Sequence, residues 1–378
     1  MGTHINGPSY LISEEDNEQK TKLEEFLAKR NPDQKELPFL FKVLSIEDPL
    51  SIQAHPNKKF AEYLHEKSPN IYKDPNHKPE MAIAISDKFY MLYGFLSVKN
   101  VKILCDFLLQ NKIFEAEKGE STDFLSLLHN FISEKDEKTN YNLYKDLLIQ
   151  LLKIPDEKNL NILTNFINYI KSAKEKGMSK IEEFILEKLK LTEILYEKFG
   201  LDKGIIFSLF MNYFQTNYGE AIFIGANIPH AYIYGDCMEC MANSDNVIRL
   251  GLTPKFIDKE NFESIIINNF DELITDNYKF NGKKINEFRI EYVKEGISDF
   301  KLNYFKMQKG NQADFYNENN AILIVIKGQL KSTLKDGKKL IIQSLIPYFI
   351  EEKTNLSFEF EESGNSADNV LEFYIASY

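Results

Sequence analysis

The pattern of apolar and polar positions changes twice along the 378 residues of this chain. Up to about residue 98, short apolar runs alternate with Pro, Asn, Asp and Gly, as at residues 37–44 (LPFLFKVL) and 81–85 (MAIAI), which predicts strands. From about residue 99 to 205, apolar residues recur three or four positions apart with Lys and Glu between them, which predicts helices. Three such helical faces comprise Phe124, Leu127, Leu128 and Phe131; Leu143, Leu147, Leu148 and Leu151; and Phe184, Ile185, Leu189 and Tyr196. Strand-like sequence returns at residues 219–225 (GEAIFIG) and continues almost to the end of the chain.

This order of elements predicts a mainly β protein with an α-helical part. We expect a β-barrel-like domain over residues 1–98 and 206–262, interrupted by a helical insertion at 99–205, and a second β domain at 263–378. Within the second β domain, Asp336 and Gly337 lie between the strand-like residues 329–334 and 339–342, which predicts a hairpin.

Composition narrows the class of protein. Lys and Arg total 46 against 57 Asp and Glu, a formal net charge of −11, and this excess of acid disfavours nucleic acid and anionic lipid as partners. No apolar run is long enough for a membrane span, and the first residues lack the basic and apolar regions of a signal peptide. Three cysteines, Cys105, Cys237 and Cys240, fit reduced thiols in a cytoplasmic protein better than a disulfide framework.

Among the six histidines, two lie in sequence suited to metal binding. Gln53 and His55 are two residues apart in a strand-like run, so both side chains point to the same face. Glu80 comes just before the strand-like residues 81–85, and His230 follows a strand and a turn. Two imidazoles, a carboxylate and an amide oxygen suit zinc with a position left open for a substrate. Taken alone, a strand histidine is more often a hydrogen-bonded core residue than a ligand, and Glu80 fits an N-cap or a surface position. For the set as a whole, spacing alone does not choose between metal binding and structural roles.

A second dense group of polar residues covers positions 239–255 (ECMANSDNVIRLGLTPK). Arg249 and Lys255 provide the local positive charge that a phosphorylated substrate requires in an acidic protein. The alternative is a polar surface loop. Cys237 and Cys240 form a lone C-x-x-C without a second pair, and we interpret them as small buried apolar residues.

These segments resemble one enzyme family closely, the type I phosphomannose isomerases. The resemblance is carried by five motifs in the family's order, at residues 37–44, 49–58 (PLSIQAHPNK), 72–80 (YKDPNHKPE), 229–232 (PHAY) and 241–255 (MANSDNVIRLGLTPK). It implies a cupin-type (jelly-roll) catalytic barrel with a helical insertion, and a C-terminal cupin-like β domain. It also implies an isomerase that interconverts mannose 6-phosphate and fructose 6-phosphate and feeds GDP-mannose and mannose metabolism.

Site residues follow from the same resemblance. It implies one zinc ion bound by Gln53, His55, Glu80 and His230, and Arg249 as the active-site arginine. It further implies substrate contacts from residues around the sugar phosphate, which are Ser51, Lys78, Tyr232, Glu239 and Lys255. We expect a cytoplasmic monomer that binds a phosphorylated hexose and neither nucleic acid nor membrane.

The chemistry of an aldose–ketose isomerase suggests roles for the catalytic candidates. Arg249 is too weakly acidic to act as a base, so we expect it to stabilise developing negative charge. Lys78 could shuttle protons, and Glu239 and Asp245 are alternative bases between which the sequence does not choose. Two alternatives come from other classes of protein. An iron(II) cupin oxygenase also uses two histidines and one carboxylate, whereas a degenerate cupin that acts as a sugar-binding or storage module usually lacks the ligands that this chain retains.

Two features depart from the family pattern. Residues 1–8 (MGTHINGP) resemble a segment that family members carry some way into the chain, so we expect the family's opening strands, with their Trp-Gly motif, to be missing. Leu250 replaces the small residue usual after the active-site arginine, and we expect this change to affect only packing.

Overall fold

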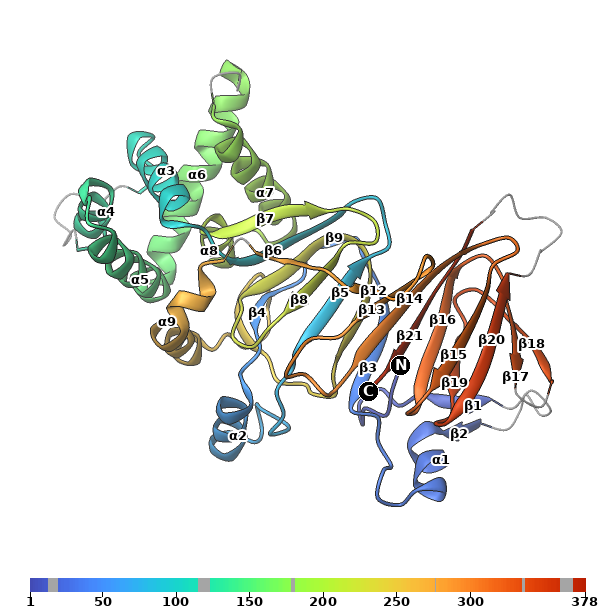
Figure 1. Cartoon of the computed structure of the whole chain (residues 1–378). Helices are drawn as coiled ribbons and strands as arrows, with labels where there is room; N and C mark the ends of the chain where they lie inside the picture. The colour runs from blue at the N-terminus through green and yellow to red at the C-terminus, as the bar shows by residue number, and fades with distance from the viewer. Residues whose placement is uncertain (13–19, 115–122, 178–180, 276, 335–336, 361–369) are drawn as a thin grey trace.

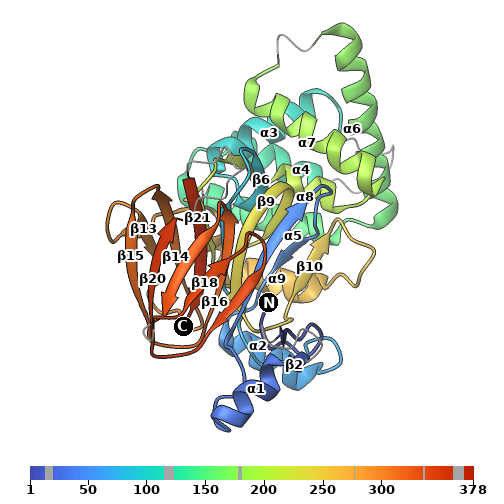
Figure 2. The same cartoon turned by 90° about the vertical axis from the view of Figure 1, so that its right-hand side faces the viewer.

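The computed structural model describes residues 1–12, 20–114, 123–177, 181–275, 277–334, 337–360 and 370–378. A β-barrel-like unit lies in the middle, with helices at one end and a β-sandwich built from the C-terminal third at the other (Figure 1). The view turned by 90° shows the same separation of the helices from the C-terminal sheets (Figure 2). The predicted mainly β fold with a helical insertion is confirmed.

The central unit is a sheet of nine strands among the residues described. Its strands are β3 (Phe39–Ile46), β4 (Ile52–Ala54), β5 (Glu80–Ala84), β6 (Phe89–Phe95), β7 (Met211–Thr216), β8 (Ala221–Ile224), β9 (His230–Ala242), β10 (Ile248–Gly251) and β11 (Lys279–Phe280). The long strand β9 organises the sheet, because its first half pairs with β4 and β6 and its second half pairs with β3 and β5. All of these pairings are antiparallel, and they bring segments far apart in sequence to one inner surface.

Alternate side chains of β5 pack into two different cores on opposite faces of the strand. Ala82 and Ala84 belong to the core inside the central unit, whereas Met81 and Ile83 belong to the core shared with the C-terminal sheets. Successive side chains of a strand point to opposite faces, so Glu80 shares the inner face with Ala82 and Ala84.

The helical insertion forms as predicted from its apolar periodicity. Its helices are α3 (Val98–Gln110), α4 (Asp123–Ser133), α5 (Glu137–Lys153), α6 (Asp156–Lys176), α7 (Glu183–Phe199) and α8 (Gly204–Leu209). Ser97 and Asp136 cap α3 and α5 by accepting backbone hydrogen bonds, and Gly200, with φ +63°, ends α7. The apolar faces of these helices join the core of the central unit.

The C-terminal third forms two packed sheets. One contains β12 (Lys283–Lys284), β13 (Arg289–Tyr292), β14 (Lys301–Gln308), β16 (Ala321–Lys327), β19 (Pro347–Ile350) and β21 (Val370–Ser377). The other contains β15 (Gln312–Asn317), β17 (Leu330–Leu334), β18 (Lys339–Ile342) and β20 (Thr354–Phe360). A small β1 (Tyr10–Ile12) and β2 (Lys20–Lys22) pair forms a separate sheet near the start of the chain.

The predicted hairpin is confirmed because β17 and β18 pair antiparallel. Gly337 has φ +84°, as a hairpin turn requires, and Asp336 lies outside the described residues.

Two parts of the strand prediction are wrong. The N-terminal region contains helices α1 (Leu23–Arg30) and α2 (Lys58–Lys67), and the strand-like C-terminal region contains α9 (Lys259–Leu273). Three consecutive isoleucines, residues 265–267, favour a strand locally. The segment forms a helix instead of a strand because Asp258 caps the helix N-terminus and because Phe262, Ile266 and Phe270 are buried on one helix face. The boundary expected between residues 262 and 263 falls within this helix, and the division into three units stays a prediction.

No helix in the described part of the chain has the length and apolarity needed to span a membrane.

Candidate active site

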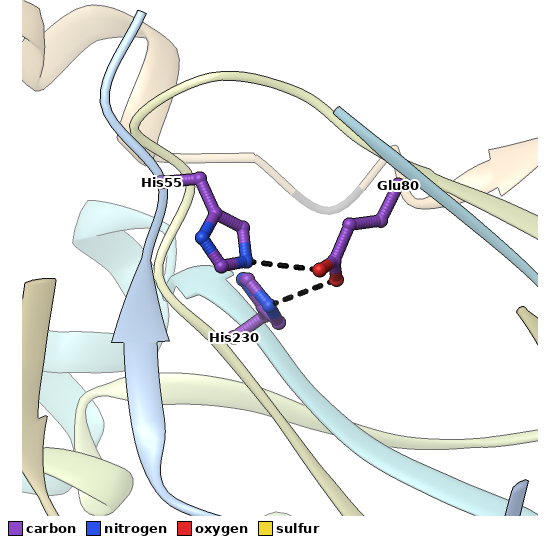
Figure 3. A group of neighbouring side chains, drawn as sticks. All are labelled: His55, Glu80 and His230. Carbon is purple, nitrogen blue, oxygen red and sulfur yellow. Dashed lines mark ion pairs between the residues drawn. The ribbon is translucent and has the colours of Figure 1, made fainter. Parts of the chain in front are cut away.

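Three buried side chains from different strands converge on the inner surface of the central unit (Figure 3). His55 follows β4, Glu80 begins β5 and His230 begins β9. The Nε2 atom of His55 lies 3.1 Å from Oε1 of Glu80, and Nε2 of His230 lies 3.4 Å from Oε2. One nitrogen or oxygen atom of each residue lies within 4.8 Å of the others. The structure therefore brings together three of the four predicted metal ligands as a compact group.

Hydrogen bonds on the far side of each ring fix the tautomer of both histidines. Nδ1 of His55 lies 2.8 Å from the Asn246 carbonyl oxygen, and Nδ1 of His230 lies 2.9 Å from the Ile228 carbonyl oxygen. A carbonyl only accepts, so each Nδ1 must carry the proton and donate it. The neutral ring then has a lone pair on Nε2, and both Nε2 atoms are buried without a hydrogen-bond partner. The two Nε2 lone pairs face the negatively charged carboxylate and repel it. A divalent cation between the two rings and the carboxylate would remove this repulsion, because all three groups would coordinate it.

Charges around the group favour the forms that bind a metal. Burial, together with the nearby Lys78 ammonium, lowers the pKa of His55 to about 4, which keeps the ring neutral. Burial by itself would raise the pKa of Glu80, but the neighbouring Lys78 ammonium outweighs burial and holds this pKa well below its usual range. The residues present therefore fit a zinc ion, because an ionised carboxylate and neutral imidazoles are its preferred ligands.

Strand register places the predicted amide ligand and the predicted arginine beside this group. Gln53 is the direct partner of His230 on one side and of Arg249 on the other. Directly paired residues of an antiparallel sheet project to the same face, so all three side chains share the inner surface. The Arg249 guanidinium makes no ion pair with a carboxylate among the described residues, and burial lowers its pKa. A half-buried cation without a counter-ion is suited to bind an anionic group.

A network of hydrogen bonds holds the loop that orients His55. Nδ2 of Asn246 donates to the carbonyl oxygens of Asp74 and Asn76, at 2.6 and 2.8 Å. The Asp74 carboxylate in turn accepts from the Ser244 hydroxyl at 2.8 Å and from the Asp245 backbone N–H at 2.9 Å. These bonds fix the carbonyl of Asn246, which is the acceptor for His55.

Glu239 lies on β9 within a buried polar group. Its carboxylate accepts from the Lys42 ammonium at 2.7 Å and from the Tyr232 hydroxyl at 3.1 Å. Burial would lower the pKa of Lys42, but Glu239 outweighs it and the pKa is raised. Burial and the same carboxylate raise the pKa of Tyr232 well above its ordinary value. The predicted Glu239 and Tyr232 are thus brought together, and Lys42 completes the group.

The remaining predicted residues are distributed unevenly. Nζ of Lys78 lies 3.1 Å from Oε1 of Glu80, so this lysine adjoins the metal-ligand group. Ser51 is half-buried just before β4, and the side chain of Lys255 is exposed beyond β10. Asp245 is exposed, and its carboxylate contacts His4 at 3.3 Å and Asn6 at 2.9 Å. Among the described contacts, none joins the Asp245 carboxylate to the metal-ligand group, and its catalytic role stays a prediction.

Sequence reasoning missed Lys42, Asp74 and Asn246. The sequence could have indicated Lys42, because it is the only charged residue in the apolar run at residues 37–44. Asn246 lies within a motif that was noticed, but nothing in the sequence shows that its amide spans to a loop 170 residues away. The cysteines were interpreted correctly, since all three are buried and free.

Comparison with known proteins identifies the family to which this chain belongs. The profile of the family described as "Phosphomannose isomerase type I, catalytic domain" matches residues 1–98. A probable mannose-6-phosphate isomerase of Caenorhabditis elegans is 33% identical over 347 residues, which cover 90% of this chain and 77% of the relative. The chain belongs to the mannose-6-phosphate isomerase family. The human member is 38% identical over 268 residues, covering 68% of this chain and 60% of the human protein.

Solved structures of this family share the fold. A zinc-bound mannose 6-phosphate isomerase superposes with a TM-score of 0.77 at 23% identity, covering all of this chain and 90% of the other. A variant of phosphomannose isomerase from Salmonella typhimurium gives a TM-score of 0.77 at 24% identity, with coverage of 100% and 89%. The predicted cupin-type architecture with a helical insertion is thereby confirmed, and the chain is a member of a family of isomerases.

Proposed function

We propose that this protein interconverts D-mannose 6-phosphate and D-fructose 6-phosphate, with one zinc ion held by Gln53, His55, Glu80 and His230. The observation that carries the proposal is the pair of buried Nε2 lone pairs that face the Glu80 carboxylate. The family supplies the substrate, because its curated members in the worm and in human are named mannose-6-phosphate isomerases. This reaction would feed GDP-mannose and mannose metabolism in the cytoplasm.

Arg249 is the charge-stabilising group in this proposal. The isomerisation transfers a proton between C1 and C2 of the sugar through an enediol(ate), and negative charge develops on the two oxygens. A bound zinc would polarise these oxygens as a Lewis acid. The Arg249 guanidinium has no carboxylate partner among the described residues. Its planar set of N–H donors can therefore donate hydrogen bonds to the two oxygens on which negative charge develops.

Lys78 is the group we assign to move the proton. Glu239 is less suited as the base, because Lys42 and Tyr232 already donate to its carboxylate. Asp245 is less suited because it is exposed and contacts His4 and Asn6 instead. Nζ of Lys78 lies 3.1 Å from Oε1 of Glu80 and its side chain is only 11% exposed, so it adjoins the proposed reaction centre. Its neutral amine would accept the proton from C2, and the resulting ammonium would return it to C1. Glu239 is then a positioning residue for Lys42 and Tyr232.

The sugar phosphate needs a positive anchor in a chain of net charge −11. Lys255 is a suitable anchor, because its side chain is exposed four residues beyond β10, the strand that carries Arg249. Ser51 lies half-buried just before β4, the strand next to β10, and its hydroxyl can donate to a phosphate oxygen. We therefore assign Lys255 and Ser51 to phosphate binding.

The test is formation of fructose 6-phosphate from mannose 6-phosphate in a coupled assay. Chelation should abolish turnover, and zinc should restore it. His230→Ala should weaken zinc binding by more than about 100-fold, whereas His129→Ala, which alters an exposed histidine of α4, should change neither binding nor turnover. Full turnover by metal-free His230→Ala protein would refute the metal assignment. Bound iron with oxygen consumption, and no fructose 6-phosphate, would favour the oxygenase alternative.

A further inference from the structure

The segment that carries Lys78 towards Glu80 has no helix or strand of its own. It is residues 73–79, the last part of the connection between α2 and β5. On one side the backbone is held by the central sheet, because the Asn76 carbonyl accepts from Asn246 at 2.8 Å and the Pro79 carbonyl accepts from the Ala242 N–H at 3.1 Å. Loops held on one side only are free to shift their other face.

The other side of the segment is held by the C-terminal sandwich. Nε2 of His77 lies 3.0 Å from Oδ2 of Asp299, and both side chains are largely withdrawn from solvent, at 24% and 14% exposed. These residues are 222 positions apart in the chain. The contact therefore joins the proposed active-site segment to a different part of the fold.

Asp299 is itself held in place by packing. The next residue, Phe300, is 3% exposed in the apolar core that the C-terminal sheet shares with the central unit. Met81 and Ile83 of β5 contribute to that core from the central unit, and Ile324 of β16 contributes from the C-terminal sheet. Leu302 and Tyr304 of β14, which begins just after Phe300, belong to the same core. The shared core thus fixes the position from which Asp299 reaches His77.

The contacts of Lys78 and His77 show which way neighbouring side chains point. Lys78 reaches Glu80 on the inner face, and His77 reaches Asp299 on the side of the C-terminal sheets. Adjacent residues of an extended chain project in opposite directions, so a change in the direction of His77 rotates the backbone that also carries Lys78. A displacement of about 1 Å at a reacting group can lower a rate by about 100-fold.

We propose that Asp299 and His77 are positioning residues, through which the C-terminal β-sandwich orients the segment that carries Lys78 and Glu80. The inference rests on the proposed function, which gives Lys78 and Glu80 their roles. It makes the C-terminal sandwich a part of the catalytic apparatus.

The test compares two substitutions at Asp299 in the full-length zinc-loaded protein. Asp299→Ala should lower kcat about 10-fold and leave KM within about 2-fold, because orientation and not substrate binding is lost. Asp299→Asn keeps an oxygen that can accept from His77 and should recover part of kcat. His77→Ala combined with Asp299→Ala should be no slower than Asp299→Ala alone, as expected for one shared contact. Glu295→Gln, at an exposed site in the same loop, is the matched control and should behave as the native protein.

A second control separates positioning from general weakening of the interface. Ile324→Val removes one methyl group from the shared core without touching His77, and should lower Tm while kcat stays native. The inference is overturned if Asp299→Ala matches Glu295→Gln in kcat, or if Ile324→Val lowers kcat as much as Asp299→Ala.

Zinc binding gives a readout that does not depend on turnover. Asp299→Ala should weaken zinc binding several-fold in competition with a chromophoric chelator, because Glu80 lies three residues beyond His77. If the native protein shows no isomerase activity but Asp299→Ala still weakens zinc binding, the proposed function fails and the positioning role stands. If the native protein isomerises mannose 6-phosphate and Asp299→Ala matches the control in both readouts, the positioning role fails alone.

Discussion

Asn246→Asp is the substitution that probes the predicted metal site most sharply. Aspartate has the same shape as asparagine, but the substitution replaces the Nδ2 donor of residue 246 by a carboxylate oxygen. That position faces three hydrogen-bond acceptors. These are the carbonyl oxygens of Asp74 and Asn76, at 2.6 and 2.8 Å, and the Asp74 carboxylate oxygen, at 3.2 Å. We expect a large loss of stability and of zinc affinity from this single change.

The magnitude follows from these contacts. The Asp74 carbonyl loses its donor, which costs about 1–3 kcal/mol for a buried group. Two carboxylates about 3 Å apart repel each other by a few kcal/mol at the effective dielectric constant of a protein. Together these terms give about 3–6 kcal/mol, which corresponds to a fall in Tm of roughly 6–24 °C at about 2–4 °C per kcal/mol for a unit of about 150–250 residues. The His55 acceptor moves with the loop, so zinc affinity should fall about 10- to 100-fold.

The assays are thermal unfolding of the metal-free protein and zinc competition with a chelator, each at pH 7.5 and pH 5. The repulsion raises the pKa of the introduced carboxyl, so its destabilisation is present at high pH and is relieved as pH falls and the group is protonated. Asn268→Asp, on the exposed face of α9, is the control and should change Tm by less than about 2 °C. Equal Tm and equal zinc affinity in the two variants would refute the reasoning, since the network around Asn246 would then not hold His55.

Three further substitutions test other parts of the structure. Arg249→Lys should lower kcat more than it changes KM, because Lys lacks the planar fork, and an effect on KM alone would make Arg249 a phosphate ligand. Glu239→Gln should cost about 1–3 kcal/mol in chemical unfolding, because it leaves the Lys42 ammonium without its counter-ion, and an unchanged midpoint would contradict this. Burial lowers the pKa of Lys188 to about 7, so the unfolded chain keeps a proton that the folded chain loses between about pH 7 and 10. Native stability relative to Lys188→Met should therefore rise with pH over that range, and parallel pH profiles in thermal unfolding would exclude a displaced pKa.

The order of the large elements could be predicted from the pattern of apolar and polar residues. Apolar residues at intervals of three and four predicted α4, α5 and α7, because a helix buries one face only when its period is followed. The pattern failed at α9, where three isoleucines favour a strand and only the Asp258 cap and the burial of Phe262 and Phe270 indicate the helix. Local preference is weak, so packing against the central unit decided that element.

The sequence also determined the ligand types of the site, since His55, Glu80 and His230 lie in motifs that are recognisable without a structure. Only the tertiary structure decided how these side chains are held. The pairing of Gln53 with both His230 and Arg249 depends on strand register, and the reach of Asn246 to Asp74 depends on how two loops fold together. The contact of His77 with Asp299 depends on how the C-terminal sheets pack against β5. Such contacts join residues more than 170 positions apart. They form only when the whole chain folds around its shared cores, so a local sequence pattern does not predict them.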